Sequence, residues 1–190
     1  MIRRRWLAAA VAVAALGLAA CGPAQAQREF EQPTCVLRND AVGLMAQAVP
    51  TARLLPCIAE FPAGWSFDSS DVEQGRARFW MDSDRAGWRV LEVTLTAACQ
   101  PSGTEIPSDE PGTRLFVHLD SIEPQYRGTR YYLVPGGCVT YRFDFPGEGA
   151  TVFSTDASTA IGTVGRGVLE RAAARIGYRV WIPPTPGRTP

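Results

Sequence analysis

Lysine is absent from the 190-residue sequence, and the 19 residues counted as lysine or arginine are all arginines. The chain therefore cannot supply the lysine of a phosphate-binding loop, a Schiff-base nucleophile or a lysine general base. Without the three arginines near the N-terminus, 16 basic residues face 19 acidic ones, and phosphate binding requires a concentrated basic face. We expect no nucleic-acid partner.

Histidine is almost absent as well, since His118 is the single one. It lies between Val117 and Leu119 on a predicted strand, so its side chain should point to the opposite face from theirs. A Ser-His-Asp hydrolase would depend on it, but no G-x-S-x-G turn accompanies it. A structural zinc site would need His118 together with cysteines that we expect to be oxidised. We expect a surface or pocket-edge histidine, no metal site and no cofactor.

The only long apolar run covers residues 6–20 and follows Arg3, Arg4 and Arg5. A membrane-spanning helix needs about 20 apolar residues, and this shorter run is followed at once by Gly22 and Pro23. A cationic start, an apolar run and small residues at its end are typical of a secretory signal. The sequence therefore predicts export rather than a stable membrane span.

The end of this run, Leu18-Ala19-Ala20-Cys21, resembles the lipobox of bacterial lipoproteins. The resemblance implies a signal peptide over residues 1–20 and a diacylglyceryl group on Cys21, which would become the N-terminus at the outer face of the cell membrane. It covers only residues 1–21 and implies no activity. Cleavage after Ala26, in the sequence Ala24-Gln25-Ala26, would instead release a soluble protein. We favour lipidation.

The remaining chain has the size of one domain. Without the three arginines of the signal, 16 basic residues face 19 acidic ones, a net charge of about −3. Residues 21–34 are polar and without periodicity, which predicts a tether, and residues 35–182 are predicted to form one domain. The proline-rich residues 183–190 predict a disordered tail.

Four cysteines lie in the predicted domain: Cys35, Cys57, Cys99 and Cys138. An even number of cysteines in an exported chain predicts two disulfides. Of the three possible pairings we favour Cys35 with Cys57 and Cys99 with Cys138, because cysteines closer in sequence meet more readily.

Apolar periodicity predicts the elements of the domain. Val42, Met45 and Val49 indicate a short helix over 39–49. Alternating residues predict a hairpin of strands 76–82 and 91–95 around a turn at 83–87, further strands at 114–119, 129–134 and 138–145, and a short strand at 150–153.

A longer helix is predicted from Thr155 or Asp156 to residue 176, followed by a strand over 178–182. Because Gly162, Gly165 and Gly167 weaken a helix, this helix should need a close packing surface. Together these elements predict an α+β fold. It would hold a mainly antiparallel sheet of about five to six strands, a short N-terminal helix and one longer C-terminal helix on one face.

Acidic residues offer two local motifs and a possible catalytic pair. Residues 82–87 resemble the opening of a calcium loop, but Ala86 and Val93 stand where oxygen ligands belong, so we expect a hairpin turn. Residues 108–112 are expected to form a solvated loop. Glycosidase chemistry needs two carboxylates at a fixed separation, and the spacing selects no pair among Glu105, Asp109, Glu110, Asp120 and Glu123.

Aromatic residues gather near the predicted strands: Trp65, Trp80, Trp88, Tyr131, Tyr132, Tyr141 and Phe143. Trp80, Trp88 and Tyr131, with His118, could form an exposed binding surface for a sugar polymer or a protein. We favour the other interpretation, in which the aromatic residues complete the core or cover a sheet face under the helix.

No catalytic set assembles from these residues. The sequence therefore predicts a lipid-anchored, non-enzymatic envelope protein that binds another envelope component. A secreted ligand-binding or cell-wall-polymer-binding module and an extracytoplasmic hydrolase remain as alternatives.

Overall fold

The computed structural model describes Cys35, residues 40–175, Gly177 and Arg179. The predicted signal peptide, Cys21, the tether, the C-terminal tail and all of the predicted last strand except Arg179 lie outside these residues. The elements in chain order are α1 (Asp40–Ala48), β1 (Leu54–Ile58), β2 (Trp65–Glu73), β3 (Arg76–Ser83), β4 (Gly87–Thr96), β5 (Thr104–Ile106), β6 (Arg114–Ser121), β7 (Gln125–Val134), β8 (Gly137–Pro146), α2 (Ala150–Ala160), β9 (Ile161–Gly165) and α3 (Arg166–Arg175).

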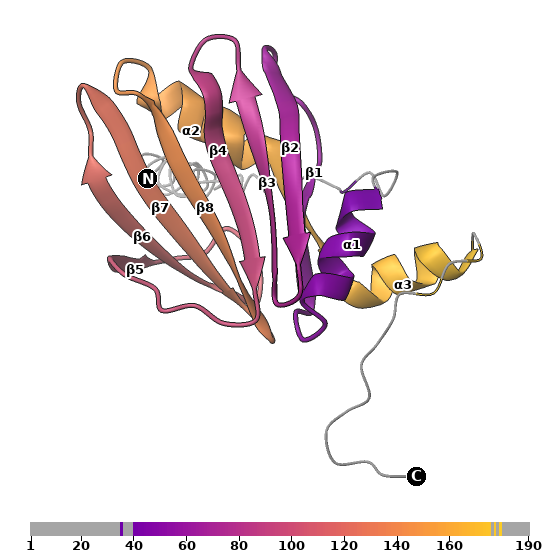
Figure 1. Cartoon of the computed structure of the whole chain (residues 1–190). Coiled ribbons are helices and arrows are strands. Elements are labelled where there is room, and N and C mark those ends of the chain that lie inside the picture. The colour runs from indigo at the N-terminus through magenta and orange to yellow at the C-terminus, as the bar shows by residue number, and fades with distance from the viewer. Residues whose placement is uncertain (1–34, 36–39, 176, 178, 180–190) are drawn as a thin grey trace, which may run out of the picture. The chain divides into compact units, whose positions relative to one another are not determined.

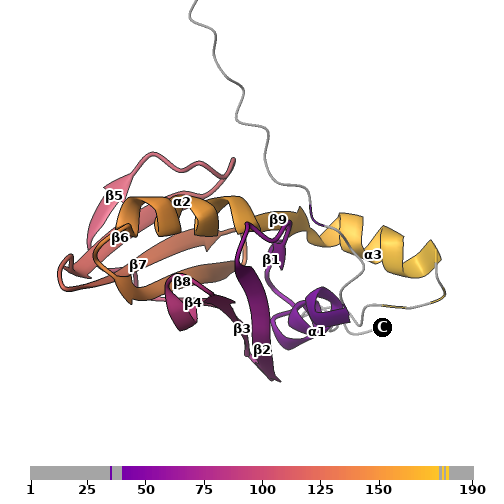
Figure 2. The ribbon, with the colours of Figure 1, turned by 90° about the horizontal axis from the view of Figure 1, so that it is seen from above.

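Seven strands form one antiparallel sheet in the order β2-β3-β4-β8-β7-β6-β5 (Figure 1). The strands β1 and β9 form a separate antiparallel pair. Figure 2 shows α2 and this pair on the same side of the sheet. The predicted α+β fold with a mainly antiparallel sheet is confirmed, although the sheet has more strands than expected.

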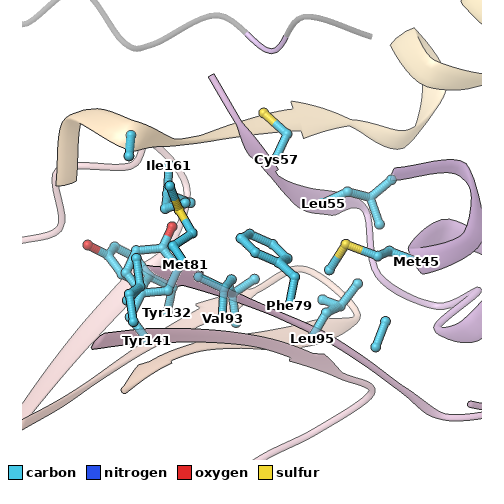
Figure 3. Packing of buried hydrophobic residues seen from close by; sticks show 14 of the residues in the cluster. Met45, Leu55, Cys57, Phe79, Met81, Val93, Leu95, Tyr132, Tyr141 and Ile161 are labelled. Carbon is cyan, nitrogen blue, oxygen red and sulfur yellow. The ribbon is translucent and has the colours of Figure 1, made fainter. Parts of the chain in front are cut away.

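The two faces of the sheet differ because successive side chains along a strand point to opposite sides. In β3, Ala77, Phe79 and Met81 are buried, whereas Arg76, Arg78 and Trp80 between them are only partly buried. The same alternation runs through β8. We call the side under α2 the covered face and the opposite side the open face. The core fills the space between the covered face and the β1–β9 pair, where Phe79 and Met81 meet Leu55 and Ile161 (Figure 3).

The helix α1 forms as predicted, and its apolar residues recur at helical spacing. Val42, Met45 and Ala46 are buried, whereas Leu44 is exposed. The last carbonyls of a helix have no partner within it. Here Arg166 supplies one, because its guanidinium donates to the carbonyl oxygens of Ala46, Val49 and Ala52 at 2.9, 2.7 and 2.7 Å.

Both predicted disulfides are confirmed. Cys35 is bonded to Cys57 in β1, and Cys99 is bonded to Cys138 at the start of β8. They close loops with sequence separations of 22 and 39 residues. Each disulfide closes a loop in the unfolded chain and so lowers the conformational entropy of the unfolded state. In the chain-entropy model this stabilises the fold by about 3 to 4 kcal/mol for each disulfide.

The prediction of one continuous C-terminal helix is wrong for the middle of that segment. The chain forms α2, then strand β9, then α3. Glycines and β-branched residues in Ile161–Gly165 favour extended backbone over helix. In addition, β9 forms hydrogen bonds with β1, a strand that lies far away in the sequence. Ile161 and Val164, whose spacing suggested a helix, are buried along this strand.

Other boundaries also need correction. Residues 150–153, expected as a strand, form the first turn of α2 behind Gly149. The strands β1, β2 and β5 were not predicted. β2 carries mostly polar residues over Trp65–Glu73, so its apolar alternation is weak, and β5 is only three residues long.

Replacing Arg166 with methionine should lower the free energy of unfolding by about 2 to 3 kcal/mol, because the variant leaves carbonyls at the end of α1 without their charged donor. Urea denaturation measures the change. Arg171→Met in the same helix is the control, since Arg171 is exposed. Equal unfolding free energies for the two variants would contradict the capping role.

Candidate functional site

The open face presents rows of polar side chains that run across the sheet. Strand register aligns one such row from β2 to β6: Ser69, Trp80, Glu92, Arg142, Thr129 and His118. The next row holds Asp71, Arg78, Thr94, Thr140, Tyr131 and Phe116. At the spacing of paired strands, each row is about 24 Å long. The open face is therefore a broad surface of ordered polar and aromatic groups.

A stack of alternating arginine and tryptophan side chains lies on the part of the open face formed by β2, β3 and β4. The guanidinium of Arg89 lies 4.3 Å from the ring centre of Trp88 and 4.6 Å from that of Trp80. Arg78 lies 4.8 Å from the ring centre of Trp80. Each cation is attracted to the electron-rich face of an indole. Trp88 is 68% exposed, so one indole of the stack faces solvent.

The carboxylate of Asp68 holds this stack in place. It accepts hydrogen bonds from Arg89 Nε at 2.8 Å, from Trp88 Nε1 at 3.3 Å and from Ser69 Oγ at 2.6 Å. The Ser69 and Arg89 bonds lower the pKa of Asp68. Arg89 has a positive φ of 49°, uncommon for a residue other than glycine. Its backbone N–H donates to Asp82 at 2.7 Å, which fixes this conformation.

Other arginines of the open face are paired with carboxylates of the same face. Arg78 bonds Asp71 at 2.7 Å, and Arg114 bonds Glu105 through two contacts of 2.8 Å. The remaining pairs are Arg76 with Glu73, Arg127 with Asp144, and Arg142 with Glu92. The open face is rich in charged groups, but the charges of opposite sign neutralise each other locally.

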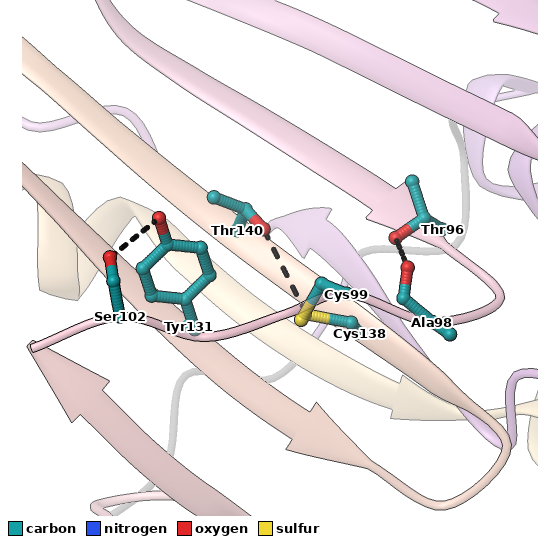
Figure 4. The surroundings of a disulfide bond; sticks show 7 residues. All are labelled: Thr96, Ala98, Cys99, Ser102, Tyr131, Cys138 and Thr140. Atoms are coloured by element: carbon teal, nitrogen blue, oxygen red, sulfur yellow. Dashed lines mark hydrogen bonds between the residues drawn. A yellow bond between two sulfur atoms is a disulfide. The ribbon is translucent and has the colours of Figure 1, made fainter. Parts of the chain in front are cut away.

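The loop after β4 crosses one end of the open face and is fixed there by the Cys99–Cys138 disulfide (Figure 4). Further along it, Ser102 Oγ donates to the Tyr131 hydroxyl at 3.3 Å. The loop therefore covers the end where β8 begins. The row that contains Trp80 and His118 lies toward the other end, and Thr129 is the one buried side chain within it.

The structure brings together only part of the predicted binding surface. Trp80 and Trp88 share the stack, but Tyr131 lies in the neighbouring row, three strands or about 14 Å across the sheet from Trp80. His118 lies in the same row as Trp80, one strand farther across the sheet. All four belong to the open face. Our expectation that the aromatic residues serve the core is correct for Trp65, Tyr132, Tyr141 and Phe143, which are buried. It is wrong for Trp80, Trp88 and Tyr131, which lie on the open face.

His118 is half-exposed, as expected of a surface histidine, and its Nε2 lies 3.1 Å from Asp120 Oδ1. No serine or threonine hydroxyl is hydrogen-bonded to this imidazole within the part of the chain that the structure describes. Among the other acids, Glu105 pairs with Arg114 on the open face, whereas Asp109 accepts a hydrogen bond from Tyr132 on the covered side. These acids therefore face opposite sides of the sheet.

A second polar cluster, which the sequence analysis missed, lies at the covered face beside α2. Tyr132 and Tyr141 pack with ring centres 5.0 Å apart, and the Tyr132 hydroxyl donates to Asp109 at 3.4 Å. Arg130 donates to Ser158 of α2 at 2.7 Å. One feature of the sequence does indicate the tyrosine of this cluster that lies on β7. Tyr131 and Tyr132 are adjacent on a strand, so one of them had to face the core.

The two buried tyrosines are held in the neutral form. Burial is the main cause of the raised pKa of both Tyr132 and Tyr141. A phenol with a raised pKa stays neutral at physiological pH and does not act as a general base there. Residues 108–112 form a loop in which Asp109, Pro111 and Gly112 are exposed, as expected, and a hydrogen bond of 2.6 Å between Ser108 and Thr113 closes it.

The turn that resembles a calcium loop is a hairpin turn between β3 and β4, as predicted. Among the residues described, no three histidine, cysteine, aspartate or glutamate side chains are grouped so that they could hold a metal ion. No helix in the described part of the chain has the length and apolarity needed to span a membrane.

A scan against protein-family models found no match to this chain, and searches of curated proteins and of solved structures found none either.

Protonation of Asp68 should disrupt the arginine–tryptophan stack, and it should do so only below the pH at which an ordinary aspartate is protonated. Because the folded pKa of Asp68 is lowered, its hydrogen bonds are retained above the ordinary value of 3.8 and lost as the pH falls through the lower folded value. The indole N–H resonance of Trp88 in a ¹H–¹⁵N NMR titration should therefore have a midpoint below 3.8. Asp68→Asn should abolish the transition, and a midpoint at or above 3.8 would count against the arrangement.

Alkaline pH should destabilise the fold through the buried tyrosines. Their folded pKa is raised, so their contribution to stability is complete below the ordinary value of 10.0 and is lost as the pH rises above it. The free energy of unfolding in urea should fall above pH 10.0, and less steeply in Tyr132→Phe/Tyr141→Phe. Equal slopes for wild type and the double variant would contradict this assignment.

Proposed function

We propose that this protein is exported, is anchored to the outer face of the cell membrane through a lipid on Cys21, and acts by binding a component of the envelope without catalysing a reaction. The open face is its binding surface. The observation that carries the binding role is the arginine–tryptophan stack, in which Trp88 is held exposed to solvent.

Export is supported by the two disulfides as well as by the signal-like N-terminal sequence. Disulfides persist in oxidising compartments outside the cytoplasm. Anchoring is supported by the lipobox-like residues that end at Cys21. Two or more acyl chains hold a protein stably on a membrane, whereas a single myristoyl chain holds it only marginally.

A binding role is supported by the way the open face is built. An exposed indole is costly in water, and this one is kept exposed by hydrogen bonds and by a backbone conformation that is uncommon for arginine. Trp and Arg are the residues that most often dominate binding energies at interfaces. The ordered groups of the open face are therefore better suited to recognition than to chemistry.

The anchor is tested by metabolic labelling of bacteria that produce the full-length chain. An alkyne analogue of palmitate should label the wild-type protein, which should fractionate with membranes. Cys21→Ser should lose both the label and the membrane association. Cys99→Ser/Cys138→Ser controls for thiol substitution and should keep the label. An unlabelled wild-type protein that begins at Gln27 would instead establish secretion after cleavage at Ala26.

The binding role is tested with lipid-extracted envelope fragments, into which a lipid anchor cannot insert. The full-length protein in detergent should sediment with the fragments, and Trp88→Ala should reduce the bound fraction by about tenfold, the loss of a single interface anchor. Phe61→Ala is the matched control, because Phe61 is 53% exposed in the loop before β2. Equal sedimentation of the two variants would exclude the open face as the binding surface.

A further inference from the structure

We infer that the component bound by the open face is an uncharged, hydroxyl-rich glycan chain, which lies along the row from Ser69 to His118 with one sugar ring on Trp88. This inference rests on the proposed function of the open face. It follows from three features of that face: its exposed indole, its paired charges and its small apolar content.

The exposed indole is a flat apolar plate whose polar atom is already satisfied. Trp88 Nε1 donates to Asp68, so a ligand need not provide an acceptor for it. One ring face packs against Arg89, which itself lies between Trp88 and Trp80. What remains available is apolar ring surface, which complements the C–H groups on one side of a sugar ring by burying apolar area.

Paired charges exclude a charged polymer as the preferred ligand. In the row itself, Arg142 lies 3.9 Å from Glu92, and Glu92 also accepts hydrogen bonds from Trp80 at 2.9 Å and Thr94 at 3.2 Å. At the far end of the row, His118 Nε2 lies 3.1 Å from Asp120 Oδ1. A polyanion or polycation would find no stretch of one sign to neutralise. Hydroxyl groups, which both donate and accept, can bond to guanidinium and carboxylate alike.

A protein partner fits this face less well. Protein interfaces have an apolar centre that is depleted of charged residues. Nine large apolar side chains are exposed among the described residues, and Trp88 is the one that packs on the open face. The rest belong to helices, loops or the covered side, and Leu44, Val152 and Val168 lie on the three helices. The centre of the open face is instead made of threonines, arginines and carboxylates.

Isothermal titration calorimetry tests the inference with the full-length protein in detergent and three neutral probes: hexasaccharides of glucose, mannose and N-acetylglucosamine. At least one should bind. Trp88→Ala should weaken that binding by about tenfold, whereas Trp88→Phe, which keeps an aromatic plate, should weaken it less. The Phe variant and a urea-denaturation curve show whether any loss in the Ala variant comes from misfolding. Phe61→Ala should bind as the wild type does.

A second pair of variants tests whether the glycan extends along the row. Arg142→Ala should weaken binding of the same hexasaccharide, because Arg142 lies at the middle of the row. Arg171→Ala, an exposed arginine on α3, should not. Equal affinities for these two variants would contradict the placement of the chain along the row.

Three results would overturn the inference: no hexasaccharide binds, binding survives Trp88→Ala unchanged, or polygalacturonate, an acidic glycan, binds more tightly than the neutral probes. The envelope-fragment assay separates this failure from that of the proposed function. If Trp88-dependent sedimentation persists while no neutral glycan binds, the open face still binds the envelope and only the glycan is wrong. If both are absent, both proposals are wrong.

Discussion

Alternation of side chains along the central strands is the constraint on which the structure depends. The residues of β3, β4 and β8 that point to one side are apolar and buried, so this side must be covered by another layer. Helix α2, helix α1 and the β1–β9 pair provide that layer. Their arrangement leaves the opposite side of the same strands in water, and its polar side chains follow from the same alternation.

The covering layer is assembled from distant parts of the chain and needs specific links. Arg166, at the start of α3, bonds the carbonyls at the end of α1, which lies well over a hundred residues earlier. Asp156 of α2 accepts hydrogen bonds from Trp65 and from Arg85, which lies in the β3–β4 turn. The Cys35–Cys57 disulfide secures β1. A covered face held by such links keeps the sheet in one shape, and this gives the open face a fixed geometry.

Sequence patterns predicted those elements of the fold that depend on interactions between residues close together in the sequence. Helix α1, the β3–β4 hairpin, the β6, β7 and β8 strands and both disulfide pairings follow from periodicity, turn residues and sequence separation. Strand β9 could not be predicted in this way, because Ile161 and Val164 fit a helical spacing and the competing partner, β1, lies about a hundred residues away. Strand β2 was missed since its residues are mostly polar and it lies at the edge of the sheet.

The candidate site was predictable only in its residue types. The sequence identified Trp80, Trp88, Tyr131 and His118 as a group. Register places Trp80, Tyr131 and His118 on the open face, and Trp88 joins them through its packing on Arg89. Their separation depends on strand order, in which β8 and β7 lie between β4 and β6. Arg89 was missed because nothing local shows that a guanidinium will lie between two indoles. That placement needs the turn at Asp82 and the carboxylate of Asp68 together.

Hydroxyl-radical footprinting measures most directly whether the open face is the surface that meets the envelope. In the free full-length protein, Trp88 should be oxidised rapidly and the buried Trp65 should be spared. On lipid-extracted envelope fragments, Trp88 should become protected while Phe61 and the exposed residues of α3 react as before. Unchanged oxidation of Trp88, with protection appearing at Phe61 or on α3, would contradict the account.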